Sequence, residues 1–162
     1  MCGHTPVTGG DGGHREKVSV IGAVTVSPRA RRVGRYFANR SDGYFDTGEV
    51  VGFRRHLLRA RVGKVIVVWD GGTNHKGPLM RAFLARNKRL WSERLPPYAP
   101  QLNPVEVVWS WLEYGQLANV VPNNLAELDD EILDRLIRLR CDPKLLRSLW
   151  DGSELPFPKN QS

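Results

Sequence analysis

Two acidic residues, Asp70 and Glu106, stand where the chain could bind a divalent cation. Asp70 directly follows an apolar run, residues 65–69, and precedes two glycines that would let a phosphate group or other backbone approach closely. Glu106 lies 36 positions further on. Because carboxylate oxygens are suitable ligands for Mg²⁺, the pair forms a candidate metal site.

Each acid also has a purely structural interpretation. Asp-Gly is an ordinary way for a chain to leave a strand, so Asp70 could be only a turn residue. In the segment NPVE, Asn103 could be the N-cap of a helix, Pro104 its first residue and Glu106 the acid that closes a capping box. Glu106 would also lie at the border of the apolar face of that helix. From position alone both interpretations of each acid stay open.

The apolar pattern predicts the elements that must position these residues. A β-branched run and a second short strand should form an antiparallel hairpin, and a continuous apolar run predicts a strand covered on both faces. Helical periodicity recurs between and after the strands. We expect strands at 17–26, 33–38, 64–69 and 90–95, and helices at 48–61, 78–88, from 103, from 124 and at 143–150. This order predicts a mixed α/β sheet covered by helices, with ligands at the carboxyl ends of its strands.

The domain organisation is simple. Residues 1–16 are rich in glycine and have no apolar period, which predicts a loose leader. Residues 17–151 should form one domain, because a chain of 162 residues can bury a sufficient core. A short tail, residues 152–162, follows.

Basic residues are concentrated in the first part of the chain. Lys and Arg number 18 against 7 Asp and Glu in residues 1–100, and 6 against 10 in residues 101–162, within a net charge of +7. Such a surface could neutralise phosphates, although a solvated basic surface without a partner stays open. In the helix at 48–61 we expect the arginines to lie outside, opposite Val50, Phe53 and Leu57. The candidate nucleic-acid contacts are Arg29, Arg31, Arg32, Arg54, Arg55, Arg59 and Lys76.

Composition argues against a membrane or secreted protein. The longest apolar stretches, such as residues 65–69, are far too short to cross a bilayer, and no secretory leader opens the sequence. Cys2 and Cys141 have no metal-ligand spacing, and we expect no disulfide between them. We therefore expect a cytoplasmic protein.

Two segments, VVWDGGTNHKG and LPPYAPQLNPVEVVWSWLE, resemble the second and third blocks of the DDE endonuclease domain of mariner-like transposases, in their bacterial insertion-sequence branch. The second segment is highly specific, because it combines many characteristic residues in a short span. The spacing from Asp70 to Glu106 is close to that of this branch. KVSVIGAV and DGYFD extend the resemblance over most of the chain.

The resemblance implies an RNase H-like fold in which three acids bind two Mg²⁺ or Mn²⁺ ions and catalyse DNA cleavage and strand transfer in transposition. Asp70 and Glu106 would be the second and third acids. Asn74, His75 and Asn103 would support the metal ligands or face the substrate, although His75 could be only a loop histidine. The implied partners are the transposon ends and the target DNA, which would place the protein at the nucleoid.

The first acid of the family does not have a counterpart. Its strand normally precedes KVSVIGAV, but Asp11 lies in GGDGGH, where we expect no strand. We therefore expect the first, central strand of the sheet to be lacking, which would leave unpaired strand edges near Val20 and Val67. A helix-turn-helix region that reads transposon ends is not found either. The chain is interpreted as an N-terminally truncated transposase.

Whether such a chain is an enzyme by itself stays open. One hypothesis is a catalytic-domain fragment with a two-metal site, provided that the first acid is supplied. The alternative is an inactive transposase fragment that binds DNA or pairs with full-length transposase as a regulator, or a remnant without function. Unpaired edges would favour self-association or pairing with a full-length copy.

Overall fold

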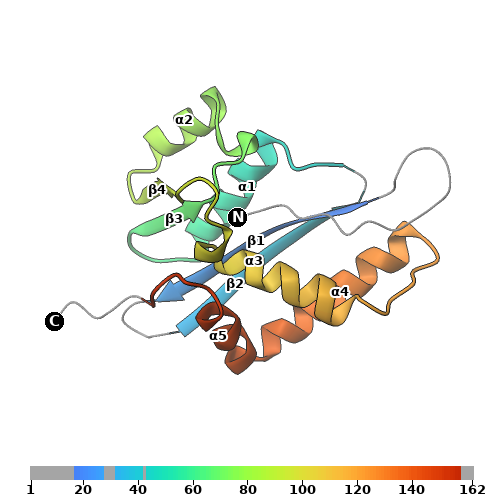
Figure 1. Cartoon of the computed structure of the whole chain (residues 1–162). Coiled ribbons are helices and arrows are strands. Elements are labelled where there is room, and N and C mark those ends of the chain that lie inside the picture. The colour runs from blue at the N-terminus through green and yellow to red at the C-terminus, as the bar shows by residue number, and fades with distance from the viewer. Residues whose placement is uncertain (1–16, 28–31, 42, 158–162) are drawn as a thin grey trace.

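The computed structural model describes residues 17–27, 32–41 and 43–157. Within them, four strands and five α-helices alternate with three shorter helical segments (Figure 1). In chain order the elements are β1 Val18–Ser27, β2 Arg32–Ser41, α1 Thr47–Arg59, β3 Val65–Trp69, η1 Thr73–His75, α2 Pro78–Arg86, β4 Leu90–Arg94, η2 Pro100–Leu102, α3 Pro104–Ser110, η3 Trp111–Gln116, α4 Leu125–Cys141 and α5 Pro143–Asp151. The predicted mixed α/β fold and the predicted order of its elements are confirmed.

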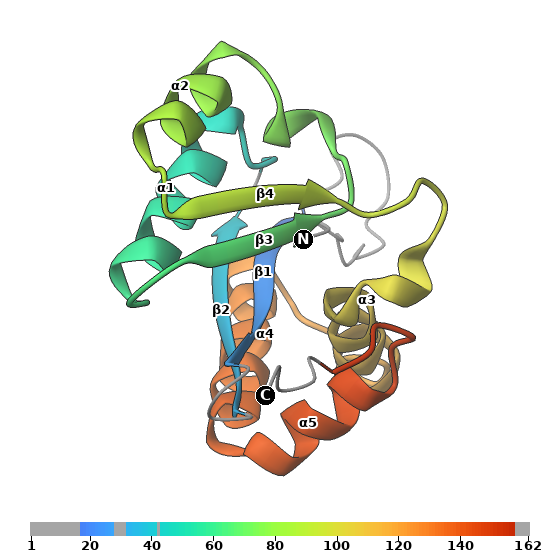
Figure 2. The same ribbon diagram turned by 90° about the vertical axis from the view of Figure 1, so that its left-hand side faces the viewer.

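The strands form two separate sheets. β1 pairs antiparallel with β2 along their whole length, as the predicted hairpin requires, and β3 pairs parallel with β4. In the described residues no strand joins β1 to β3. Figure 2 shows the β3–β4 pair lying across the β1–β2 hairpin rather than beside it. The sheet is therefore divided at the position where the central strand was expected to be lacking.

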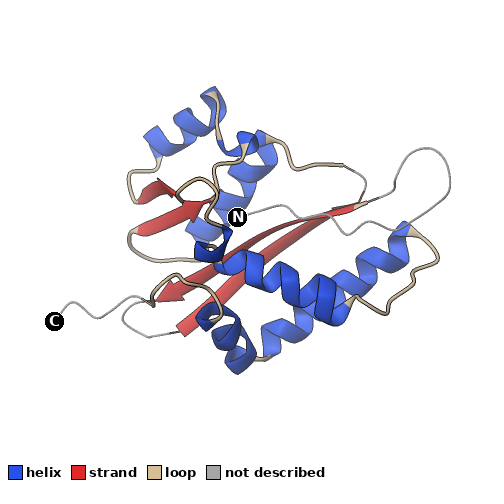
Figure 3. Cartoon of the chain, in the orientation of Figure 1, coloured by secondary structure: helices blue, strands red, loops and turns tan. Residues whose placement is uncertain are grey.

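Helices cover both faces of the hairpin (Figure 3). Val18 and Val20 of β1 pack with α3, α4 and α5, whereas Ile21 packs with α1, α2 and the β3–β4 pair. Successive side chains of a strand point to opposite faces, so this alternation places β1 between two hydrophobic clusters. Trp109 of α3 is 3% exposed and its ring lies 5.8 Å from that of Phe37. The packing fixes α3 against the hairpin.

The prediction that the apolar run of β3 is covered on both faces is wrong. Val67 and Trp69 are buried against the helices, but Ile66 is 68% exposed and Val68 is 40% exposed. The helices cover one face of the two-stranded β3–β4 sheet and leave the other open. The described helices include none that is long and apolar enough to span a membrane.

Candidate metal centre

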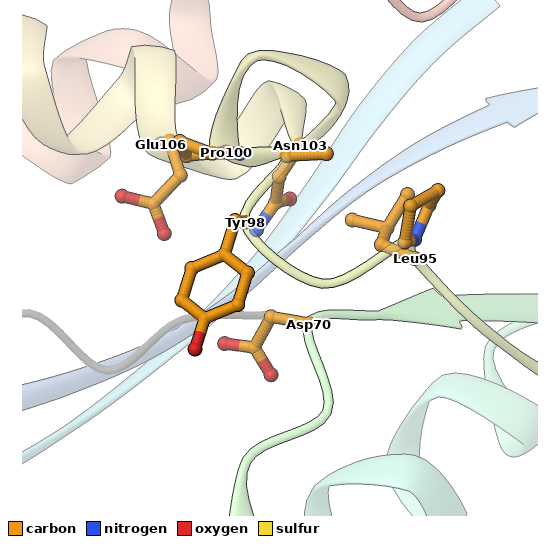
Figure 4. Close-up of a pocket in the computed structure, with 8 residues that line it drawn as sticks. Asp70, Leu95, Tyr98, Pro100, Asn103 and Glu106 are labelled. Carbon is orange, nitrogen blue, oxygen red and sulfur yellow. The ribbon is translucent and has the colours of Figure 1, made fainter.

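Asp70 and Glu106 line one pocket of about 160 Å³ (Figure 4). Asp70 lies at the carboxyl end of β3, and Glu106 lies in the first turn of α3. The chain between them runs through α2 and β4 and returns as a proline-rich loop, which forms the rest of the wall. The other lining residues are Leu95, Pro96, Tyr98, Ala99, Pro100 and Asn103. Segments far apart in sequence thus bring the two predicted acids together.

Asp70 has the turn role that its sequence predicts. Its Oδ1 accepts a hydrogen bond from the backbone N–H of Gly72 at 3.0 Å. Gly71 has a φ of +95°, a backbone conformation that residues with a side chain rarely adopt, so glycine is favoured at this position, and the Arg94 side chain lies directly against it. Within the described chain Oδ2 makes no hydrogen bond. The turn therefore orients Asp70 and leaves one carboxylate oxygen available.

Of the two interpretations of Glu106 that the sequence left open, the capping box does not form, although Asn103 is the N-cap. Asn103 is the N-cap of α3, and its Oδ1 accepts from the backbone N–H of Val105 at 3.3 Å. The backbone N–H of Asn103 instead donates to the carbonyl of Pro100 in the η2 turn at 2.9 Å. Glu106 is half-buried, and its carboxylate has no hydrogen bond or ion pair with any residue that the structure describes. Capping therefore does not account for this acid.

Asn103 adds a donor to the pocket. Its side chain is 4% exposed, and Nδ2 is buried without a hydrogen-bond partner in the described parts of the chain. An unpaired buried N–H group is unfavourable, and a phosphate oxygen or a metal-bound water would satisfy it. Figure 4 shows Asn103 beside Glu106 on one side of the pocket and Asp70 on the other side.

The donor set fits a hard divalent cation. Mg²⁺ and Mn²⁺ prefer carboxylate oxygens and water, and the pocket offers two carboxylates with free oxygens. The described residues contain no group of three or more His, Cys, Asp or Glu that could hold a metal. Asp70 and Glu106 would therefore hold an ion together with water or with ligands from outside the described residues.

Asn74 and His75 do not line the pocket. The amide of Asn74 donates to the backbone carbonyl of Phe45 at 3.3 Å. His75 is 5% exposed, its ring stacks on that of Trp69 with 5.1 Å between centroids, and its Nδ1 lies 3.0 Å from Nη2 of Arg54. Both residues make contacts that hold the loop after Asp70 in place. These contacts are consistent with support of Asp70 and not with direct contact to a metal ion in the pocket.

The surroundings of His75 predict a loss of stability in acid. Burial, and secondly the charge of Arg54, lower the pKa of His75 from 6.5 to about 4. Below pH 6.5 the unfolded chain binds a proton that folded His75 does not, so stability falls as the pH falls towards 4. We expect about 2 kcal/mol of unfolding free energy to be lost from this group between pH 7 and pH 5. Urea unfolding at both pH values measures it.

Two histidine variants serve as the comparison in that measurement. His75→Gln should reduce the pH dependence, whereas His56→Gln, at an exposed position of α1, should retain it. An unchanged pH dependence in His75→Gln would contradict the assignment.

The structure separates the predicted basic contacts into three groups. Arg32, Arg55, Arg59 and Lys76 are exposed. Arg29 and Arg31 lie outside the described residues. The prediction that Arg54 lies on the outer face of α1 is wrong, because its side chain is 1% exposed. It lies one turn after Val50 and one turn before Leu58, on the face that packs into the core. The same spacing, read from the sequence, could have revealed this.

Two residues near the pocket were not found from sequence. Tyr98 lines it with a φ of +58°, a strained conformation for a residue other than glycine, and is fully exposed. Arg94 ends β4 beside the end of β3, and its side chain covers Gly71. Parallel strands end at the same edge of a sheet, so the sequence could have predicted that Arg94 lies near Asp70. No sequence pattern indicates the positive φ of Tyr98.

In this mixed α/β domain, a carboxylate after β3 and one in the first turn of α3 line the same pocket, an arrangement that would suit a divalent cation. Residues 2–129 match the family described as DDE superfamily endonuclease. The chain belongs to this family.

Solved structures with the same fold include transposase and intasome chains. The catalytic domain of Mos1 transposase, in a structure with raltegravir and Mg, is 17% identical with a TM-score of 0.60 over 93% of this chain and 74% of that one. Another structure, of the Mos1 mariner transposase catalytic domain, is 16% identical with a TM-score of 0.58, over 93% and 72%. A chain of the simian T-cell lymphotropic virus intasome in complex with PP2A regulatory subunit B56 gamma is 13% identical with a TM-score of 0.54, over 99% and 56%. None of the curated proteins matches. These similarities confirm the predicted RNase H-like fold.

Proposed function

We propose that this chain is the catalytic-domain portion of a DNA transposase of the bacterial insertion-sequence branch. It would cleave DNA phosphodiesters and transfer strands at the nucleoid with Mg²⁺ or Mn²⁺. The observation that carries the proposal is the pairing of Asp70 and Glu106 in one pocket, each with a carboxylate oxygen that no described residue uses. The Mos1 catalytic domain, which has the same fold, has been solved with Mg and with Mn.

The chain's own residues would divide the chemistry between them. Bound divalent ions activate the attacking water or 3′-hydroxyl and stabilise the leaving oxygen. Asp70 and Glu106 would hold these ions from opposite walls of the pocket, and Asn103 Nδ2 would donate to a phosphate oxygen. Exposed Arg55 and Arg59 would contact the DNA backbone, where each phosphate contact adds to affinity and to its salt dependence. The other proposed contacts are Arg29, Arg31, Arg32 and Lys76.

A two-metal site needs a third acid. The division between the β1–β2 and β3–β4 sheets supports a strand between β1 and β3 as its source. Our proposal is that this strand comes from a preceding part of a longer polypeptide or from a second polypeptide, such as a full-length transposase. Such pairing would also satisfy the backbone groups at the edges of β1 and β3.

Metal removal tests the enzymatic proposal. Manganese binding, measured by electron paramagnetic resonance, should occur at the pocket because two carboxylates there have free oxygens. When the polypeptide that supplies the third acid is present, nicking of supercoiled plasmid DNA should require Mg²⁺ or Mn²⁺ and should stop with EDTA. Failure of the chain to bind Mn²⁺ would contradict the proposal.

A regulatory transposase fragment is the second candidate function. It is favoured by the finding that the described residues bring two acids together rather than three. Such a fragment would bind DNA in a mobility-shift assay, or inhibit a full-length transposase in a mixture, without nicking DNA by itself. Nicking by the purified chain would exclude a purely regulatory fragment and support the enzymatic function.

A further inference from the structure

Arg54 is a buried cation that has no acidic partner among the residues the structure describes. Its side chain extends from α1 into the core and is 1% exposed. Burial lowers its pKa to about 10, so the guanidinium stays charged at neutral pH. In the described part of the protein no carboxylate forms an ion pair with it, and its Nε has no hydrogen-bond partner. A buried charge without a counter-ion is strongly unfavourable, so packing alone does not explain this residue.

The guanidinium of Arg54 connects four elements. Nη1 donates to Oγ of Ser92 in β4 at 3.2 Å and lies 3.5 Å from Sδ of Met80 in α2. Nη2 lies 3.0 Å from Nδ1 of His75 in η1. Since arginine has no acceptor, it must donate, and His75 must carry its proton on Nε2. The planar guanidinium therefore donates one hydrogen bond to β4, through Nη1, and one to η1, through Nη2.

These contacts fix both ends of the loop that carries Asp70. Trp69 directly precedes Asp70, and His75 ends the η1 turn that follows it. The two rings stack on each other, and the guanidinium carbon of Arg54 lies 5.8 Å from the centroid of the Trp69 ring. Arg54, His75 and Trp69 thus form one buried cluster.

The loop itself needs such support. It contains Gly71 and Gly72, which have few conformational restrictions, and within the described residues the Asp70 side chain has one hydrogen bond, from the Gly72 backbone. A small movement of the loop would separate Asp70 from Glu106, which is held on α3 by the packing of Trp109.

We propose that Arg54 is a positioning residue for Asp70. By fixing His75 and Trp69 it keeps the Asp70 carboxylate facing Glu106 in the geometry that binds the metal ion. The proposal rests on the proposed function of the pocket as a metal site. It gives a role to an arginine at a buried position where an apolar side chain of similar size would leave the core as stable or more stable.

The variant Arg54→Met, made in the full chain, distinguishes an effect on the position of Asp70 from an effect on the stability of the fold. Methionine fills a similar volume without the charge, so the melting temperature should stay the same or rise. Manganese affinity should nevertheless fall by about tenfold or more, as is common when a group behind a metal ligand is removed. The ¹⁵N spectrum of His75 should show loss of the single Nε2–H tautomer. Arg86→Met, at an exposed position of α2, should change none of these.

Arg54→Lys is the second variant. Lysine keeps the charge but lacks the fork, so it should also weaken Mn²⁺ binding by about tenfold while the chain stays folded. If Arg54→Met does not fold, the Mn²⁺ affinity of Arg54→Lys tests the proposal in its place. Wild-type affinity in a folded Arg54→Lys would overturn the proposal.

Asp70→Asn and the wild type are measured beside these variants. If the wild type binds Mn²⁺ and Asp70→Asn does not, the metal site is supported, and unchanged affinity in Arg54→Met then overturns the positioning role alone. If the wild type does not bind Mn²⁺, the metal site and the positioning role that depends on it are overturned together.

Discussion

Asp70→Asn and Glu106→Gln are each expected to abolish Mn²⁺ binding at the pocket and to reduce metal-dependent DNA nicking by about a thousandfold. A bound metal ion stabilises transition-state charge by several kcal/mol, and about 1.4 kcal/mol corresponds to a tenfold change in rate. The substitutions keep size and shape and remove only the charge. Both effects are measured on the same preparations, metal binding by electron paramagnetic resonance and nicking on plasmid DNA with the polypeptide that supplies the third acid added.

Matched controls come from acids outside the pocket. Glu93→Gln changes an exposed side chain of β4, and Asp130→Asn changes an exposed side chain of α4. Both variants should bind Mn²⁺ and nick DNA as the wild type does. Asp70→Asn and Glu106→Gln chains that also match the wild type would remove the two acids from the metal site.

Trp109→Ala is expected to lower the free energy of unfolding by about 3–5 kcal/mol, the usual cost of deleting a large buried aromatic side chain. Trp109 packs against Phe37 and against Gly22, where an added Cβ would lie 2.9 Å from the indole ring. Because whole domains are stable by only about 5–15 kcal/mol, the loss would leave the fold marginal. It would also release α3, which carries Glu106. Urea unfolding followed by circular dichroism measures the change.

Trp91→Ala provides the matched control for Trp109→Ala. Trp91 is 65% exposed on β4, so its removal should change the unfolding free energy by no more than about 0.5 kcal/mol. Equal losses in the two variants would contradict the assignment of Trp109 to the core that supports the site.

The sequence by itself determined the elements and the two acids. Strands and helices follow from local patterns of side chains, such as the β-branched run of β1 and the Asn103-Pro104 start of α3. The pairing of Asp70 with Glu106 came from a resemblance that the shared pocket then supported. Both kinds of information are contained in short segments, so they can be read without the fold.

The tertiary structure alone decided which side chains meet. Arg54 bonds to Ser92, 38 positions away. The spacing within α1 places Arg54 on the buried face, but no pattern within α1 specifies its partners in α2, β4 and η1. Likewise, the η2 turn, rather than the Glu106 side chain, satisfies the Asn103 backbone, which leaves the Glu106 carboxylate available. The division of the sheet and the open face of β3 also depend on which segments lie side by side. Burial and hydrogen-bond partners depend on residues distant in sequence, so local conformational preferences do not predict them.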